Sequence, residues 1–133
     1  MLSELLTFDR IEIGQSLGVH ESIIDQAALD RWRAVYGDDV GGNTDAAPPD
    51  MVSGIVMAAQ LELTNPHPDG GLHAGQQYVL HRRPVIGDTL RTSSVPLSKE
   101  VRKGRRWVQM KTETRDQQDR LIYEAVLTMI WAA

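Results

Sequence analysis

The chain has 133 residues, a length that suits one domain with a single hydrophobic core. A formal net charge of -4, with no face obviously saturated with Lys and Arg, argues against nucleic acid as the main partner. The absence of cysteine excludes disulfides and thiolate chemistry. No run approaches the roughly 20 apolar residues of a membrane span, and the first residues lack the features of a secretion signal. We therefore expect a soluble, cytoplasmic protein.

Residues 8–24 predict a first strand or pair of strands, with Ile11 and Ile13 preceding Gly14. Asp25 is a suitable N-cap for a helix, and Gly37 is placed to end it. Apolar residues recur between them at helical spacing: Ala28, Leu29, Trp32, Val35 and Tyr36. A loop rich in turn residues follows over 37–48.

The most apolar stretch runs from Pro48 to Leu63 and predicts a helix that needs cover on most of its circumference. Pro49 suits the first helical position, and Asp50 adds a carboxylate near the positive end of the helix dipole. Small residues, Gly54 and the Ala58-Ala59 pair, leave part of the helix surface thin enough for another backbone to approach. The rest of the chain must wrap this helix.

After a loop over 65–71 the hydrophobic period changes to two, as in β-strands. Four strands are expected, at about 72–83, 88–98, 105–115 and 120–132. In the third strand Val108, Met110, Thr112 and Thr114 share one face, and Gln109, Lys111, Glu113 and Arg115 share the other. The last strand is apolar on both faces, which suits a central strand or a dimer interface. These elements predict an α+β fold in which an antiparallel sheet curls around one helix.

Two stretches resemble the MaoC-like branch of the hotdog superfamily, which contains (R)-specific enoyl-CoA hydratases and 3-hydroxyacyl-thioester dehydratases. One is the helix ending in Tyr36-Gly37-Asp38, with a loop and the apolar helix after it. The other is residues 75–90, where Arg83-Pro84 and the run Ile86-Gly87-Asp88-Thr89-Leu90 resemble the family's strand corner and restart. The resemblance implies one hotdog domain over residues 1–133, a curved antiparallel sheet wrapped around one long hydrophobic helix, and no cofactor.

The resemblance also identifies a catalytic motif, which this chain carries only in part. Active members have Gly-Asp-x-Asn-Pro-x-His, whose Asp and His hold one water, while an N–H at the start of the central helix polarises the thioester carbonyl. The motif's Gly and Asp fall on Gly37 and Asp38. Its Asn, Pro and His fall on Val40, Gly41 and Asn43. Asn43 can hold a water but cannot usefully accept its proton, so the base is missing.

Two further departures concern the start of the apolar helix. The N–H of Asp50 would have to polarise the carbonyl beside a carboxylate, and residues 44–48 are much shorter than the segment that active members fold over the acyl chain. The resemblance implies that these domains work in pairs, in some of which one half has lost its motif and opens a wider tunnel. We therefore hypothesise a non-catalytic subunit that pairs with a catalytic MaoC-like chain or a second hotdog copy. The substrate would be a bulky acyl-CoA, such as a long-chain or steroid side-chain thioester, or an acyl carrier protein thioester.

By the same resemblance, Asp50, Met51, Gly75, Gln76 and Arg82 are the expected substrate-binding residues. Other functions stay open: Asp38 could serve a self-sufficient hydratase, and Asp50 or Glu62 could activate water in a hotdog thioesterase. A binding or scaffold protein that holds an acyl thioester without chemistry would lack the same histidine.

The histidines and the basic run have both functional and structural interpretations. Four histidines, at 20, 67, 73 and 81, show no metal-ligand spacing. His73 and His81 would share one face of a regular strand, where either could replace the missing base, although packing or surface roles are expected. Arg102, Lys103, Arg105 and Arg106 surround Gly104. They would either meet the phosphates of CoA or form a solvated hairpin tip.

Overall fold

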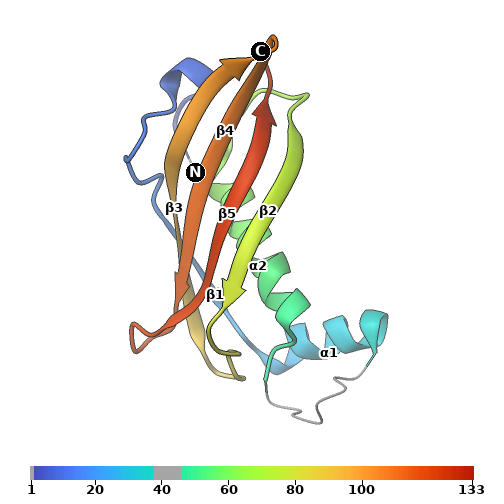
Figure 1. The fold of residues 1–133 in the computed structure, drawn as a ribbon. Coiled ribbons are helices and arrows are strands. Elements are labelled where there is room, and N and C mark those ends of the chain that lie inside the picture. The colour runs from blue at the N-terminus through green and yellow to red at the C-terminus, as the bar shows by residue number, and fades with distance from the viewer. Residues whose placement is uncertain (1, 38–45) are drawn as a thin grey trace.

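The computed structural model describes residues 2–37 and 46–133, and in it a five-stranded antiparallel sheet packs along one long helix (Figure 1). The elements are the 3-10 turn η1 (Phe8–Arg10), β1 (Val19–Ile23), α1 (Gln26–Tyr36), α2 (Pro49–Thr64), β2 (Leu72–Leu80), β3 (Thr89–Arg102), β4 (Arg105–Arg115) and β5 (Leu121–Trp131). The strand order is β1-β3-β4-β5-β2, so β1 and β2 are the edges. The predicted α+β class and the sheet curled around a helix are confirmed.

Both helices form where local chemistry predicts them. The Asp25 carboxylate accepts a hydrogen bond of 2.7 Å from the Ala28 N–H, and Gly37, at φ +85°, ends α1. Pro49 occupies the first position of α2, where a missing N–H costs nothing, and the helix ends at Thr64, one residue beyond the predicted end. α1 projects from the end of the molecule at which α2 begins (Figure 1).

The core lies between α2 and the sheet. As predicted, alternate residues of β4 from Val108 to Thr114 are buried, and the residues between them are exposed or half-buried. β5 lies between β4 and β2, which confirms the prediction of a central strand. Apolar side chains of α2, β3 and β5 make up most of the main cluster: Met51, Val52, Val56, Leu90, Ile122, Tyr123 and Leu127. Each buried aliphatic side chain of this size contributes roughly 1.5–3 kcal/mol.

Of the two predicted alternatives before α1, the single strand is found, because Ile11 follows a 3-10 turn and packs into a second cluster with Leu6 and Trp131. Two strand ends differ from the prediction. β2 ends at Leu80 instead of residue 83, since the chain turns into the corner at Pro84. β3 continues to Arg102 instead of residue 98, since a bulge between Pro96 and Ser98 absorbs the proline.

α2 is less covered than its composition predicts. Gly54, Ala58 and Leu61 are exposed, and they lie on one side of the helix because they are spaced by four and three residues. Leu61 is 59% exposed. The described chain therefore leaves one stripe of α2, residues 54, 58 and 61, without a partner.

Candidate functional site

The start of α2 offers one backbone donor. Pro48 and Pro49 have no N–H, and the N–H groups of Met51 and Val52 both donate to the Pro48 carbonyl, at 3.0 and 3.3 Å. Among the described residues, nothing accepts a hydrogen bond from the Asp50 N–H. This N–H lies at the positive end of the helix dipole, next to the exposed Asp50 carboxylate. The geometry allows the predicted donor role for Asp50 but gives it the unfavourable neighbour that the sequence indicates.

Arg83 positions the segment that leads into α2. Its Nε donates to the Ala47 carbonyl at 2.9 Å and its guanidinium reaches the Ala46 carbonyl at 3.5 Å. The Ala47 N–H in turn donates to the Pro84 carbonyl at 2.7 Å. Arg82, the arginine predicted to bind substrate, is exposed beside this junction. The sequence of the Arg82-Arg83 pair does not indicate which of the two arginines contacts the segment before α2.

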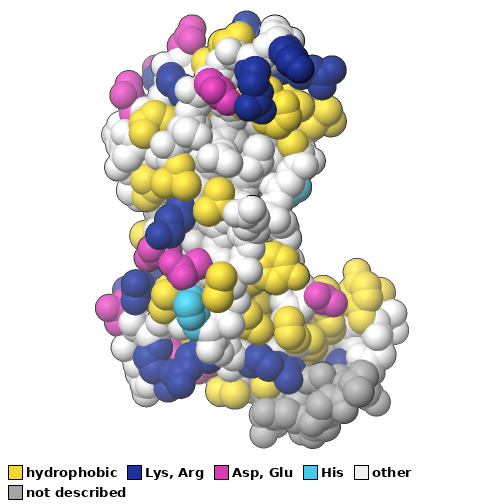
Figure 2. Space-filling view, in the orientation of Figure 1, with side chains coloured by type: hydrophobic (Ala, Val, Ile, Leu, Met, Phe, Trp, Pro, Cys, Tyr) yellow, Lys and Arg dark blue, Asp and Glu magenta, His cyan; other side chains and the backbone are white. Residues whose placement is uncertain are grey.

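An open flank lies between the α2 stripe and the inner face of β2. Gln76 and Tyr78 are exposed, and they pair with Leu127 and Ala125 of β5, whose side chains are buried on the α2 side of the sheet. The Tyr78 ring stacks on Tyr123, with centroids 5.6 Å apart. Gly75 has open space where a Cβ would stand, so the described chain does not require glycine there. Figure 2 shows hydrophobic side chains gathered between the sheet and α1.

Tyr123 is the buried phenol of this flank. Burial raises the pKa of Tyr123, the nearby Tyr78 raises it further, and a hydrogen bond with Ser53 of α2 partly offsets both effects. The phenol therefore stays protonated at neutral pH. It is a hydrogen-bonding group of the α2–β5 contact and does not supply a base.

A pocket of about 260 Å³ lies at the C-terminal end of α2. Its walls come from α2, residues 67–73 and the end of β5. Apolar side chains (Met57, Leu61, Leu72, Met129, Ile130 and Trp131) are joined there by the titratable side chains of His67, Asp69 and His73. Gln60 lies in the wall and is oriented by Ser94, whose hydroxyl donates to the Gln60 Oε1 at 2.6 Å. The pocket is not predictable from sequence pattern, because its residues come from three distant segments. We call it the distal pocket.

The two strand histidines do not share a face, and that prediction is wrong. His73 pairs with Met129, but a bulge before Gly75 reverses the alternation of β2. His81 follows the strand and meets Glu124 on the outer face, with Nε2 and Oε2 2.8 Å apart. The hydrogen bond with His81 lowers the pKa of Glu124, and Lys111 also lowers it. His81 therefore points away from α2 and cannot replace the missing base at its start.

The remaining predicted residues divide into two groups. Asp38 and Asn43 lie outside the described residues, so their roles stay predictions. The Met51 side chain is buried in the main core, and only its backbone lies near the start of α2.

In the described part of the chain, no group of three His, Cys, Asp or Glu side chains is arranged to hold a metal ion. Its helices are all too short or too polar to cross a membrane.

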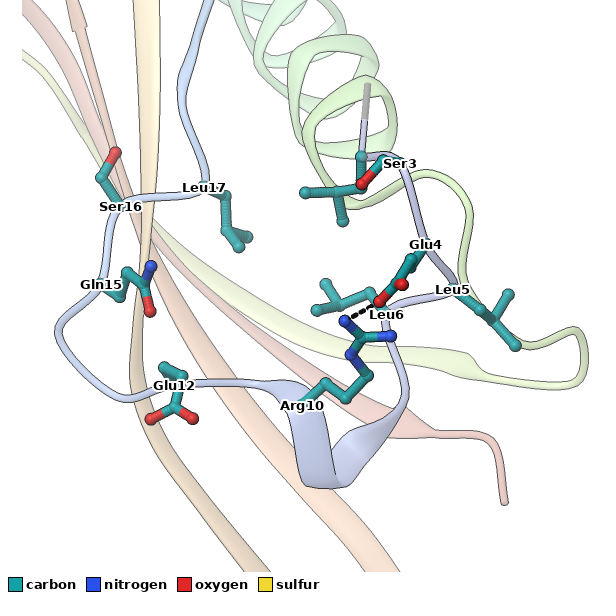
Figure 3. A pocket seen from close by; sticks show the side chains of 10 residues that line it. Ser3, Glu4, Leu5, Leu6, Arg10, Glu12, Gln15, Ser16 and Leu17 are labelled. Atoms are coloured by element: carbon teal, nitrogen blue, oxygen red, sulfur yellow. Dashed lines mark ion pairs between the residues drawn. The ribbon is translucent and has the colours of Figure 1, made fainter.

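A second pocket of about 260 Å³ lies under the N-terminal segment. Figure 3 shows Arg10 paired with Glu4 beside it and Leu5 pointing away. Both charged side chains are more than half exposed, and such surface ion pairs contribute little. We assign no role to this pocket.

Comparison with known proteins shows what fold these features belong to. No protein-family model matches the sequence, and none of the curated proteins compared with it matches. Solved structures match along nearly the whole chain. The (R)-hydratase PhaJ1 from Pseudomonas aeruginosa is 20% identical, with 94% of this chain and 84% of that chain covered, at a TM-score of 0.76.

Two further structures agree. A MaoC-like dehydratase from Rhodospirillum rubrum is 15% identical, with 96% and 98% of the two chains covered, at a TM-score of 0.78. The ChsH1-ChsH2 complex from Mycobacterium tuberculosis matches at 14% identity, 91% and 98% coverage and a TM-score of 0.72. The chain therefore has the hotdog fold, and its structural neighbours include MaoC-like dehydratases and (R)-hydratases, as the sequence resemblance implies.

Proposed function

We propose that this chain is the non-catalytic subunit of an (R)-specific enoyl-CoA hydratase, or 3-hydroxyacyl-thioester dehydratase, and pairs with a MaoC-like chain that carries the catalytic Asp and His. The observation that carries the proposal is Asn43 at the position of the family's histidine. Hydration needs a base that takes a proton from water, and an amide cannot supply it. The likeness to hydratases and to a two-chain complex supports this function.

The β2 edge supports the pairing. β2 has no Lys, Glu, Asp or Pro, the residues with which edge strands commonly avoid association. Its apolar side chains are exposed on both faces: Leu72 at 60%, Tyr78 at 55% and Val79 at 53%. Leu61 of the open α2 stripe lines the distal pocket together with Leu72 of this edge. A second hotdog chain that added a strand here would cover both surfaces.

The distal pocket supports a role in shaping the acyl tunnel. A two-fold axis that pairs β2 with the partner's edge strand in antiparallel fashion turns the partner end for end. The start of the partner's central helix, where the thioester carbonyl would be polarised, then comes to the end of this chain that holds the distal pocket. The pocket would extend the partner's tunnel and admit bulky acyl groups, including long-chain or steroid side-chain thioesters. The carrier would be CoA or acyl carrier protein, and the expected location is the cytoplasm.

The test is an enoyl-CoA hydration assay on this chain alone and on its complex with a co-expressed MaoC-like chain, with crotonyl-CoA and a bulky enoyl-CoA. We expect turnover only in the complex. A variant outside the α2 stripe, Met57→Trp, narrows the distal pocket and should lower the rate with the bulky substrate more than the rate with crotonyl-CoA.

Two results would contradict the proposal. Hydration by this chain alone would indicate a self-sufficient enzyme that uses Asp38. Release of free CoA by this chain alone, lost in Asp50→Asn or Glu62→Gln, would indicate a thioesterase.

A further inference from the structure

The β3–β4 hairpin concentrates positive charge in a chain whose net charge is -4. Four of the five residues at its tip are cationic: Arg102, Lys103, Arg105 and Arg106. Figure 2 shows Lys and Arg side chains gathered at the end of the molecule where this hairpin lies. In the described chain one carboxylate accompanies them, that of Glu100, whose Oε1 is 3.1 Å from a nitrogen of Arg102.

The sheet register holds two of these cations against each other. Arg102 lies directly opposite Arg105 across the antiparallel ladder, an arrangement of like charges that destabilises a strand pair. The ladder is tight, because Lys103 (φ 51°) and Gly104 (φ 74°) form a two-residue turn. The arginines therefore stand on regular strands instead of a loose loop. Within the described chain Arg102 has Glu100 as a partner, whereas no carboxylate pairs with Arg105.

A second pair of opposed arginines on the same strands has more acidic neighbours than the pair at the tip. Arg91 lies opposite Arg115, but acidic side chains surround that pair. Glu21 lies 3.6 Å from Arg91, and Glu113 and Asp119 lie 3.4 and 4.0 Å from Arg115. Each arginine of that pair has a carboxylate partner, whereas at the tip only Arg102 has one, so an anionic ligand would supply the negative charge that Arg105 lacks.

The tip also offers an aromatic surface and space. Arg102, Lys103, Arg105 and Trp107 line a concavity of about 600 Å³, within the size range of small-molecule sites. The Arg102 guanidinium carbon lies 4.7 Å from the centre of the Trp107 ring. Guanidinium groups bind phosphates through paired hydrogen bonds, and an indole stacks on a nucleobase. The combination suits a phosphorylated nucleoside better than a bare anion.

We propose that this tip concavity binds the phosphorylated adenosine end of a CoA thioester whose acyl group reacts on the partner subunit. The inference rests on the proposed function for the identity of the thioester. The hairpin tip lies at the end of the molecule that holds the distal pocket, opposite the start of α2 (Figure 1). An antiparallel partner brings its thioester site to this end, so the tip would serve that site and not the chain's own.

The site is tested on the full chain by titration with adenosine 3′,5′-bisphosphate, followed by calorimetry and by tryptophan fluorescence. We expect saturable binding that quenches the fluorescence of Trp107. The double variant Arg102→Gln/Arg105→Gln should weaken binding about tenfold or more. The matched control Arg91→Gln/Arg115→Gln, which removes the same charge from the same strands, should bind like the wild type. Trp107→Phe should lose the quenching, and Trp32→Phe should keep it.

Three results would overturn the inference: no saturable binding, equal loss in the two double variants, or binding of inorganic tripolyphosphate as tight as that of the nucleotide. The third would mean a general polyanion surface. In the active complex, Arg102→Gln/Arg105→Gln should raise KM for an enoyl-CoA and leave KM for the matching enoyl-pantetheine unchanged. A complex that does not hydrate enoyl-CoA would contradict the proposed function. The titration of this chain alone would still show whether the tip concavity binds the nucleotide.

Discussion

Gln60 and Ser94 are polar side chains in the core, and each is tolerated there because the other satisfies it. Gln60 is 3% exposed, and its Oε1 accepts from the fully buried Ser94 hydroxyl at 2.6 Å. Its Nε2 lies 2.8 Å from the Met110 sulfur. This contact joins α2 to β3 and β4 next to the distal pocket, so it fixes the helix against the sheet where the pocket forms.

We predict that Gln60→Leu lowers the free energy of unfolding by about 1–3 kcal/mol, because it leaves the buried Ser94 hydroxyl with the Met110 sulfur, a weak acceptor 3.8 Å away, as its one remaining partner. Urea denaturation measures the change. Gln60→Leu/Ser94→Ala should recover part of the loss, since no unpaired polar group then remains. Gln76→Leu, at an exposed position, is the control and should stay within about 0.5 kcal/mol of the wild type. A double variant less stable than Gln60→Leu would contradict this account.

The carboxyl group of Asp116 makes the free energy of unfolding depend on pH in the acid range. Burial alone would raise the pKa of Asp116, but hydrogen bonds from the backbone N–H and the guanidinium of Arg120, with another from the Gln118 N–H, lower it below its ordinary value of 3.8. A lowered pKa means that the carboxylate stabilises the folded state above pH 3.8 and that this stabilisation is lost as pH falls through the folded-state pKa. We predict that Asp116→Asn reduces stability at pH 7 and flattens its decline below pH 4, measured by thermal unfolding at each pH. If Asp116→Asn leaves the decline of the melting temperature below pH 4 unchanged, the prediction is contradicted.

Among the secondary-structure elements, helix ends and the buried face of a strand are predictable, because both depend on residues close together in the sequence. Asp25 and Gly37 define α1, and the alternation from Val108 to Thr114 defines the buried face of β4. Bulges are not visible in this way, because the extra residues in β2 and β3 are Ala74 and Leu97, which suit either face of a strand. The bulge in β2 is the reason that the prediction of one shared face for His73 and His81 is wrong.

The site residues show the same limit. The start of α2 and its Asp50 donor are predictable from Pro48-Pro49-Asp50 and the family resemblance. The role of Arg83 and the distal pocket depend on contacts between segments that lie tens of residues apart, and no periodicity reports such contacts.

We predict that Ala58→Arg, in the open stripe of α2, prevents pairing without unfolding the chain. The side chain is exposed in the described chain, so helix content and melting temperature should change little. An arginine there would face a desolvated interface in the pair. Sedimentation velocity should show a shift to monomer, whereas Ala27→Arg, the same substitution at an exposed position of α1, should assemble like the wild type. Normal assembly of Ala58→Arg would exclude the stripe from the interface.

At the scale of the whole molecule, the incomplete features lie on one side. The uncovered stripe of α2 and the uncharged β2 edge meet at the distal pocket, where Leu61 and Leu72 lie in one wall. Single-chain folding leaves this side exposed, whereas the opposite edge, β1, has its own charged residue, Glu21, paired with Arg91. A second chain on this side would complete the fold and the binding site together.

The most direct test of this account is the turnover number of the two-chain complex with a bulky enoyl-CoA when each subunit is altered in turn. Removal of the catalytic histidine from the MaoC-like partner should lower kcat by about 100-fold or more, since it removes the base. Asp38→Ala in this chain should leave kcat within about twofold of the wild type. A loss of activity in Asp38→Ala as large as that from the partner's histidine would contradict the account, because catalysis would then reside in this chain.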